Sequence, residues 1–150
     1  MIHRLDREQV LPLPVDEVFA FFLRAHNLEV ITPPWLRFEV LTPEPLRMAP
    51  GTLIDYRLRL YGIPLRWVTR IEEWEANRAF VDRQLHGPYR LWHHRHEFMA
   101  VENGTLVRDS VHYELPLGLV GELAHALLVR RDLERIFDFR RDAVVRLLTA

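Results

Sequence analysis

The stretch LWHHRHEFMAVENGTLVRDSVHYEL, residues 91–115, decides the fold class. At its centre, Asn103-Gly104 is a dipeptide typical of tight hairpin turns, and alternating apolar residues lie on both sides of it. A two-residue loop at this position pairs Glu102 with Thr105 and brings the two arms together in antiparallel order. On one face we then expect the pairs Ala100–Val107, Phe98–Asp109, His96–Val111, His94–Tyr113 and Trp92–Leu115. That face is mainly apolar and the other is charged, so the pattern predicts an antiparallel sheet covered on one side only.

A second hairpin is centred on Tyr61-Gly62 and gives the same result. Its expected pairs are Leu58–Leu65, Tyr56–Trp67 and Ile54–Thr69, which form another apolar face. The outer face carries Arg57, Arg59, Arg66 and Arg70 among the carboxylates Asp55, Glu72, Glu73 and Glu75. We interpret it as a solvated, ion-paired surface and not as a phosphate or membrane site.

The remaining pattern places helices before and after the strands. We expect strands at 2–11, 35–41, 52–60, 63–74, 79–86, 91–101 and 105–115, a helix from Pro14 to Ala25, and a short helix or turn at 27–34. A helix at 119–148 is long enough to cover the sheet, with Gly118 and Gly121 as a flexible joint before it. Its predicted buried stripe is Leu123, Ala126, Leu127, Leu133, Ile136, Phe137, Arg140, Val144 and Leu147. The fold class is therefore α+β.

Composition excludes several kinds of chemistry. The 150 residues are 49% hydrophobic, which suits a single domain over 1–150. Twenty basic residues, all arginine, balance 21 acidic ones to a net charge of −1, so no nucleic-acid partner is expected. Cysteine and lysine are absent and Ser110 is the one serine, which excludes thiolate and Schiff-base chemistry. Without a leader pattern or a long apolar run, we expect a cytoplasmic protein with no stable membrane insertion. The oligomeric state stays open.

Four segments carry a resemblance to a known superfamily: WVTRIEEW at 67–74, FVDRQLHGPYRLWHHRHEF at 80–98, GTLVRDSVHYELPLG at 104–118 and IFDFR at 136–140. With the order of elements, they resemble an uncharacterised bacterial subgroup of the START-like or Bet v 1-like (SRPBCC, polyketide cyclase/dehydrase) superfamily. The resemblance implies a helix-grip fold, in which a curved sheet wraps a long C-terminal helix and leaves space between them. It does not identify a function, because the superfamily includes lipid carriers, quinone chaperones, hormone receptors, aromatase/cyclases and co-chaperones.

The HHRH run at 93–96 raises the question of a metal. His94 and His96, two apart on a strand, project from one face, and His93 projects from the other. A third ligand would be Asp109 or Asp82, but the expected register sets Asp109 opposite Phe98, beside neither histidine. We therefore expect no bound transition metal and no cofactor.

Ionisable groups on the concave apolar face are the more informative feature. His94, His96 and Asp109 lie there with Tyr56 and Tyr113 nearby, and burying such groups costs free energy unless they are hydrogen-bonded. They could form an internal network that braces the sheet, or they could orient the polar end of a ligand. Asp82 and Gln84 join them if the loop around 87–89 turns Phe80 inward.

The leading hypothesis is non-covalent binding of a small hydrophobic molecule, such as a lipid, quinone or polyketide-like aromatic. Its expected contacts are Tyr56, Trp67, Phe80, Asp82, Gln84, Trp92, His94, His96, Phe98, Asp109 and Tyr113. We expect a cavity of at least about 300 Å³ between sheet and helix, entered near the loops 60–64, 87–90 and 116–121. The alternative is an aromatase/cyclase or dehydratase in which a cavity histidine is the general acid or base. A third possibility is an interaction domain whose aromatic residues fill the core.

Overall fold

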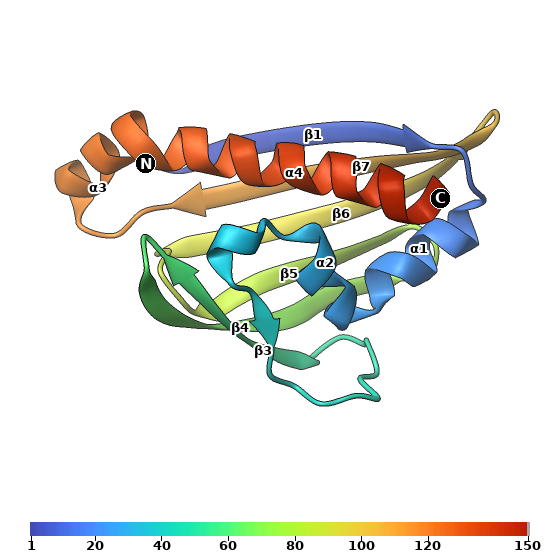
Figure 1. The fold of residues 1–150 in the computed structure, drawn as a ribbon, viewed down its shortest axis with the longest axis horizontal. Coiled ribbons are helices and arrows are strands. Elements are labelled where there is room, and N and C mark those ends of the chain that lie inside the picture. The colour runs from blue at the N-terminus through green and yellow to red at the C-terminus, as the bar shows by residue number, and fades with distance from the viewer. Residues whose placement is uncertain (150) are drawn as a thin grey trace.

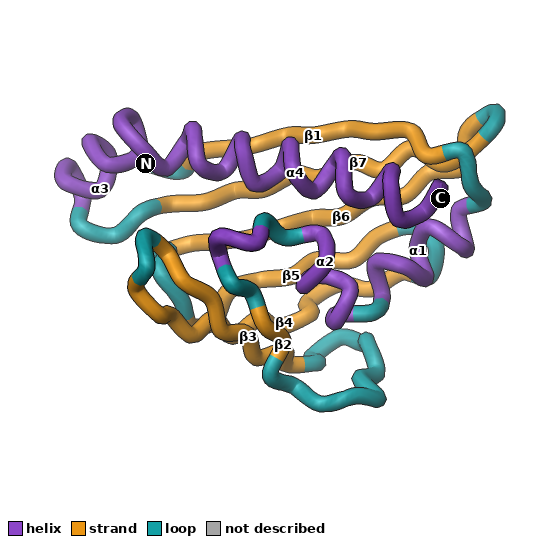
Figure 2. Tube along the Cα trace, viewed as in Figure 1, coloured by secondary structure: helices purple, strands orange, loops and turns teal. Residues whose placement is uncertain are grey.

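A computed structural model describes residues 1–149 and shows one seven-stranded antiparallel sheet, ordered β1-β7-β6-β5-β4-β3-β2 (Figures 1 and 2). The strands are β1 His3–Leu11, β2 Glu39–Val40, β3 Leu53–Leu60, β4 Ile63–Glu75, β5 Ala79–His86, β6 Leu91–Val101 and β7 Gly104–Glu114. The helices are α1 Val15–Leu23, α2 Leu28–Ile31, α3 Gly118–Ala124 and α4 Arg130–Thr149, with a π-helical turn at His125–Val129 between the last two. The sheet curves around α4, which confirms the predicted α+β helix-grip fold.

The predicted strand at 35–41 is wrong for most of its length. Pro34–Leu36 forms a 3₁₀ turn, and only Glu39–Val40 pairs with β3. Proline at the first position of the turn favours helical geometry, and Arg37 leaves the turn in the left-handed region at φ 46°. Pairing can therefore start only two residues further on.

The hairpin between β3 and β4 has the predicted register. Tyr56 pairs with Trp67 and Ile54 with Thr69. Both turn residues, Tyr61 and Gly62, have positive φ, at 51° and 78°, as a type I′ turn requires.

The register predicted between β6 and β7 is wrong by two residues. Val101 pairs with Gly104, so the loop consists of Glu102 and Asn103, and Asn103 takes the left-handed conformation at φ 67°. Gly104 is needed for a different reason: a Cβ there would lie 2.1 Å from the carbonyl oxygen of Leu11. A shift of two keeps every side chain on its predicted face but changes the cross-strand partners. Asp109 consequently lies opposite His96.

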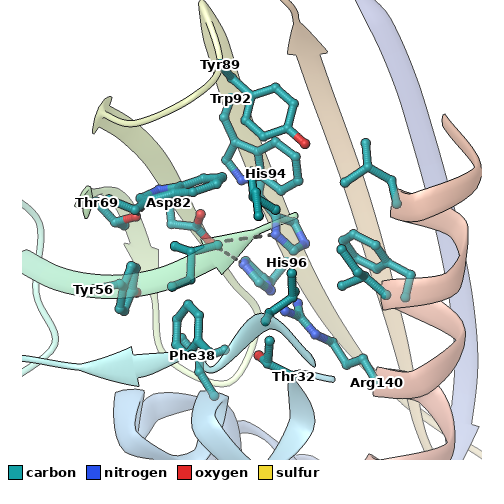
Figure 3. A pocket seen from close by; sticks show the side chains of 18 residues that line it. Thr32, Phe38, Tyr56, Thr69, Asp82, Tyr89, Trp92, His94, His96 and Arg140 are labelled. Carbon is teal, nitrogen blue, oxygen red and sulfur yellow. Dashed lines mark hydrogen bonds and ion pairs between the residues drawn. The ribbon is translucent and has the colours of Figure 1, made fainter. Parts of the chain in front are cut away.

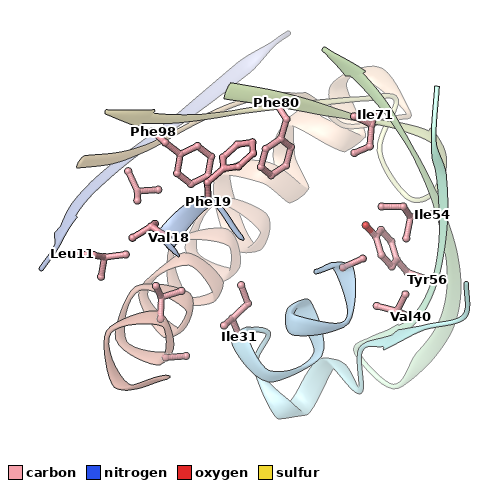
Figure 4. Packing of buried hydrophobic residues seen from close by; sticks show 14 residues of the cluster. Leu11, Val18, Phe19, Ile31, Val40, Ile54, Tyr56, Ile71, Phe80 and Phe98 are labelled. Carbon is pink, nitrogen blue, oxygen red and sulfur yellow. The ribbon is translucent and has the colours of Figure 1, made fainter. Parts of the chain in front are cut away.

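Helix α1 closes one end of the sheet with a solid aromatic core (Figure 4). Phe19 packs edge-on against Phe98 at 5.0 Å between ring centroids, and against Trp74 at 5.2 Å. Phe80 stacks near Phe98 at 6.0 Å in the same cluster. This end of the space between helices and sheet is therefore filled.

The C-terminal helix follows the predicted stripe only in its second half. Leu133, Phe137 and Val144 are buried, whereas Leu123 and Leu127, predicted to be buried, face outward. Leu147 is also exposed at 41%. The π-helical turn causes the change, because its wider hydrogen-bond spacing alters the phase of the helix between α3 and α4.

Gly121 in α3 and His125 at the start of the π-helical turn are buried in place of the leucines. Gly121 does not act as the expected flexible joint: a Cβ there would lie 2.1 Å from the carbonyl oxygen of Pro116, so glycine permits close packing. Among the described residues, no helix has both the length and the apolar character that a membrane crossing needs.

Candidate functional site

A cavity of about 130 Å³ lies between α4, α2 and the inner face of strands β3 to β6 (Figure 3). Its walls are mainly apolar, formed by Leu28, Phe38, Leu58, Trp67, Trp92 and Leu133. It is smaller than the expected 300 Å³. Trp67, Tyr89 and Trp92, which line it, pack on one another, with 5.3 Å between the centroids of Trp67 and Trp92 and 4.8 Å between those of Tyr89 and Trp92, and take up part of the space.

Two of the three predicted entry loops adjoin this cavity. Leu60 and Tyr89 line it, from the loops at 60–64 and 87–90. The third prediction is wrong, because no residue of 116–121 lines it.

The structure brings together about half of the predicted site residues. The cavity is lined by Tyr56, Trp67, Asp82, Trp92, His94 and His96. The others lie elsewhere. Phe80 and Phe98 belong to the aromatic core, and the Gln84 amide closes the adjoining loop by donating to the Tyr89 carbonyl at 2.7 Å and accepting from the Tyr89 amide at 3.1 Å. Tyr113 bonds to His125.

The polar side of the cavity is a cluster of two histidines and two aspartates, Asp82, His94, His96 and Asp109, which we call the His–Asp cluster. His94 Nε2 donates to Asp109 Oδ1 at 2.8 Å, and His96 Nε2 donates to Asp82 Oδ2 at 2.5 Å. The imidazole rings stack 3.7 Å apart, and each is within 4 Å of the second carboxylate as well. The histidines are only 3% and 5% exposed. Asp109 does not line the cavity and reaches it only through its bond to His94.

The four groups shift one another's pKa. Burial alone would raise the pKa of Asp109 and of Asp82, but the neighbouring histidines outweigh it and hold both well toward the ionised form. Burial and the nearby His96 lower the pKa of His94. Burial also works to lower the pKa of His96, yet its hydrogen bonds to the two carboxylates raise it. The two carboxylates therefore favour the ionised form, and of the two imidazoles His96 favours the protonated form and His94 the neutral one.

Contrary to the expectation from the sequence, a third possible metal ligand lies beside the two histidines. Asp82, His94 and His96 offer ligand atoms within 4.8 Å of one another, so a third ligand is adjacent after all. Coordination by these groups would have to break existing hydrogen bonds, because the Nε2 atom of each stacked ring already bonds a carboxylate.

Sequence reasoning missed one further charged residue, Arg140 on α4. It lines the cavity, and its Nε atom is buried with no hydrogen-bond partner. Across residues 1–149, its guanidinium pairs with no carboxylate within 4 Å. The guanidinium carbon lies over the ring of Phe137, 5.0 Å from the ring centroid. The signal was available: an arginine stood on the apolar stripe of a helix predicted to be buried.

A second polar group lies at the other end of the helix, outside the cavity. His3 Nε2 donates to Glu122 at 2.9 Å, and its ring stacks on His125 at 3.5 Å. His125 in turn bonds the Tyr113 hydroxyl at 2.7 Å. These contacts tie β1, β7 and the π-helical turn together.

One family profile and several solved structures match this chain. The sequence profile of the family described as "Polyketide cyclase / dehydrase and lipid transport" matches residues 11–139. Among curated proteins, none matches this sequence.

Three solved structures illustrate the likeness in fold. Ara h 8.0201 has a TM-score of 0.70 at 15% identity over 99% of both chains. A START superfamily protein from Mycobacterium smegmatis has a TM-score of 0.71 at 12% identity, over 97% of this chain and 99% of that one. The Zhui aromatase/cyclase from Streptomyces sp. R1128 has a TM-score of 0.66 at 15% identity, over 97% and 90%.

Proposed function

Because the chain belongs to the polyketide cyclase/dehydrase and lipid-transport family, whose fold binds hydrophobic ligands, we propose that it binds a compact apolar molecule non-covalently in the cavity of Figure 3. The aromatic walls favour a flat ring, and about 130 Å³ is close to the roughly 150 Å³ of a cavity that accepts benzene. The proposed ligand is thus about one ring in size, at the small end of the lipids, quinones and aromatics considered from the sequence.

The observation that carries the proposal is the unpaired Nε of Arg140. A buried donor without a partner costs about 1–3 kcal/mol, and a ligand oxygen in the cavity would recover that cost. The charges indicate what kind of oxygen. The two carboxylates offset the Arg140 guanidinium and the positive charge that is favoured on His96, so a neutral acceptor such as a carbonyl adds no unbalanced charge.

The test compares two probes of nearly equal shape by ligand-observed NMR titration: acetophenone, and α-methylstyrene, in which a methylene group replaces the carbonyl oxygen. We expect the wild type to bind acetophenone about tenfold more tightly, since a hydrogen bond to a charged donor contributes about 1.5–3 kcal/mol. Arg140→Met keeps the apolar stem but removes the donor, and should abolish the preference. Arg141→Met, an exposed arginine on the same helix that bonds Asp142, is the matched control. Equal affinities for both probes in the wild type would contradict the proposal.

An enzymatic role is the second candidate, and one feature favours it. His94 is held by Asp109 through Nε2, while its Nδ1 is 3.8 Å from Asp82, beyond hydrogen-bond reach. A neutral imidazole fixed by a carboxylate, with its other nitrogen unbonded, is the arrangement of a general base. Native mass spectrometry of protein from its own host would identify a retained molecule. Conversion of that molecule by wild type but not by Asp109→Asn would favour catalysis over binding.

A further inference from the structure

The helix that begins at Gly118 presents its apolar side to solvent and its polar side to the rest of the protein. Leu117, Leu119, Val120, Leu123, Leu127 and Leu128 each expose at least 52% of their surface. Between residues 115 and 129 the one charged side chain is Glu122, and it turns inward to His3. The helix therefore turns its half-exposed carboxylate toward β1, buries a histidine and presents leucines to solvent, the reverse of what an isolated domain needs.

A second segment extends this surface. The β3–β4 hairpin tip exposes Tyr61 at 69% and Ile63 at 62%. The Tyr61 hydroxyl donates to Asp132, which lies one helical turn after Leu128, so the tip adjoins the leucine face. We call these eight residues the apolar cap. It occupies the end of the molecule farthest from α1 (Figure 1). Contiguous exposed apolar surface of this kind marks an interaction site.

The charges around the apolar cap indicate its partner. Arg90, Arg130 and Arg131 are exposed beside it, and within residues 1–149 neither Arg90 nor Arg131 pairs with a carboxylate. The nearby acids have partners within the chain: Glu114 and Glu122 pair with the N-terminal ammonium, Glu134 pairs with Arg130, and Asp132 accepts from Tyr61. An apolar surface with an arginine rim complements a lipid surface that carries negative headgroups. A second copy of the chain would bring a like-charged rim against this one.

We propose that the apolar cap docks on the surface of an anionic membrane. The leucines insert among the acyl chains near the headgroups, and the three arginines contact lipid phosphates. The polar contacts of Glu122, His3 and His125 hold the helix so that this face stays outward. Leu60 and Tyr89, which line the cavity, lie on the hairpin and loop beside the cap, so docking would place this side of the cavity near the lipid.

Vesicle co-sedimentation tests the proposal. Vesicles of phosphatidylcholine containing about one third phosphatidylglycerol should bind the wild type, and phosphatidylcholine alone should bind it several-fold less. The affinity of the variant Leu123→Ser/Leu127→Ser should be lower by a factor of about ten or more, because it loses two leucines that would be buried in the lipid. Arg130→Gln/Arg131→Gln should weaken binding to the anionic vesicles only, as should raised salt.

The control is Val10→Ser/Met99→Ser, which removes two exposed apolar side chains on β1 and β6, away from the apolar cap. It should bind vesicles as the wild type does, and thermal melts should show all four proteins folded. An equal loss in this control, or no binding of the wild type to anionic vesicles, would overturn the proposal. So would a concentration-dependent dimer in sedimentation equilibrium that disappears in the leucine variant, since the cap would then serve a second copy.

Discussion

At the scale of single residues, the face of the strand on which a side chain lies decides whether it can contact a ligand in the cavity. His94 and His96 line the cavity, whereas their neighbour His93 lies on the opposite face of β6. Asp109 supports the pair without lining the cavity. Substitutions at His93 and His94, one position apart, therefore test the two faces of β6 separately.

We predict that His94→Ala and His96→Ala each weaken acetophenone binding by about 1–3 kcal/mol, because a polar contact or its support is lost. His93→Ala should change the affinity little. The measurement is titration of the three variants, with thermal melts in parallel. If His94→Ala and His96→Ala are less stable but bind with unchanged affinity, the cluster is only a structural network.

The lowered pKa of Asp109 predicts a pH dependence of stability. Its carboxylate is favoured in the folded state, so its contribution is present above about pH 4 and is lost as the pH falls through the lowered value. Asp109→Asn should reduce the unfolding free energy at pH 7 by about 1–3 kcal/mol and flatten the decline between about pH 5 and 3. Denaturant unfolding across this range measures both effects. Asp142→Asn, at an exposed position, should leave the decline as in the wild type.

The raised pKa of His96 acts in the opposite direction. The protonated imidazole is favoured in the folded state, so its contribution is present below about pH 6.5 and is lost as the pH rises through the raised value. His96→Gln keeps a hydrogen-bond donor but removes this titration. The wild type should therefore lose stability relative to His96→Gln as the pH rises above neutrality. A constant difference between the two proteins from pH 6 to 9 would contradict the raised pKa of His96.

At the scale of elements, the β6–β7 hairpin depends on a contact with β1. Gly104→Ala should destabilise the protein by about 1–3 kcal/mol or more, since its Cβ would lie 2.1 Å from the Leu11 carbonyl oxygen and the strands would have to separate. Gly51→Ala tests conformational strain alone, because φ is 90° there but no atom lies within 4 Å of the added Cβ. Equal losses in the two variants would show that the close approach is not limiting.

The C-terminal helix shows how an element can have two faces of different use. Before the π-helical turn its outward side is apolar, and after it the inward side is apolar. Both halves of the helix are amphipathic, but the apolar side faces away from the sheet before the turn and toward the sheet after it. A pattern read as one continuous stripe therefore misplaces Leu123 and Leu127.

At the scale of the whole molecule, the space between helices and sheet divides into a filled end and an open end. Phe98→Ala should cost about 3–5 kcal/mol of stability, because it leaves a void in the core around Phe19. The variant should bind acetophenone like the wild type at a temperature where it is folded, since Phe98 does not line the cavity. Calorimetric melts and titration together measure both effects. Loss of binding in the folded variant would mean that the two ends are coupled.

The sequence by itself determined the fold class and the inward or outward direction of most strand residues, because side-chain parity follows from local turns and alternation. It placed His94, His96 and Asp82 on one face for that reason. Tertiary structure decided which residue lies opposite His96. A register shift of two residues leaves every side chain on the same face, and the register adopted depends on the contact between Gly104 and Leu11. The phase of the C-terminal helix and the role of Arg140 likewise depend on packing between segments distant in the chain. Local pattern carries no information about such contacts, which form only when the sheet closes around the helix.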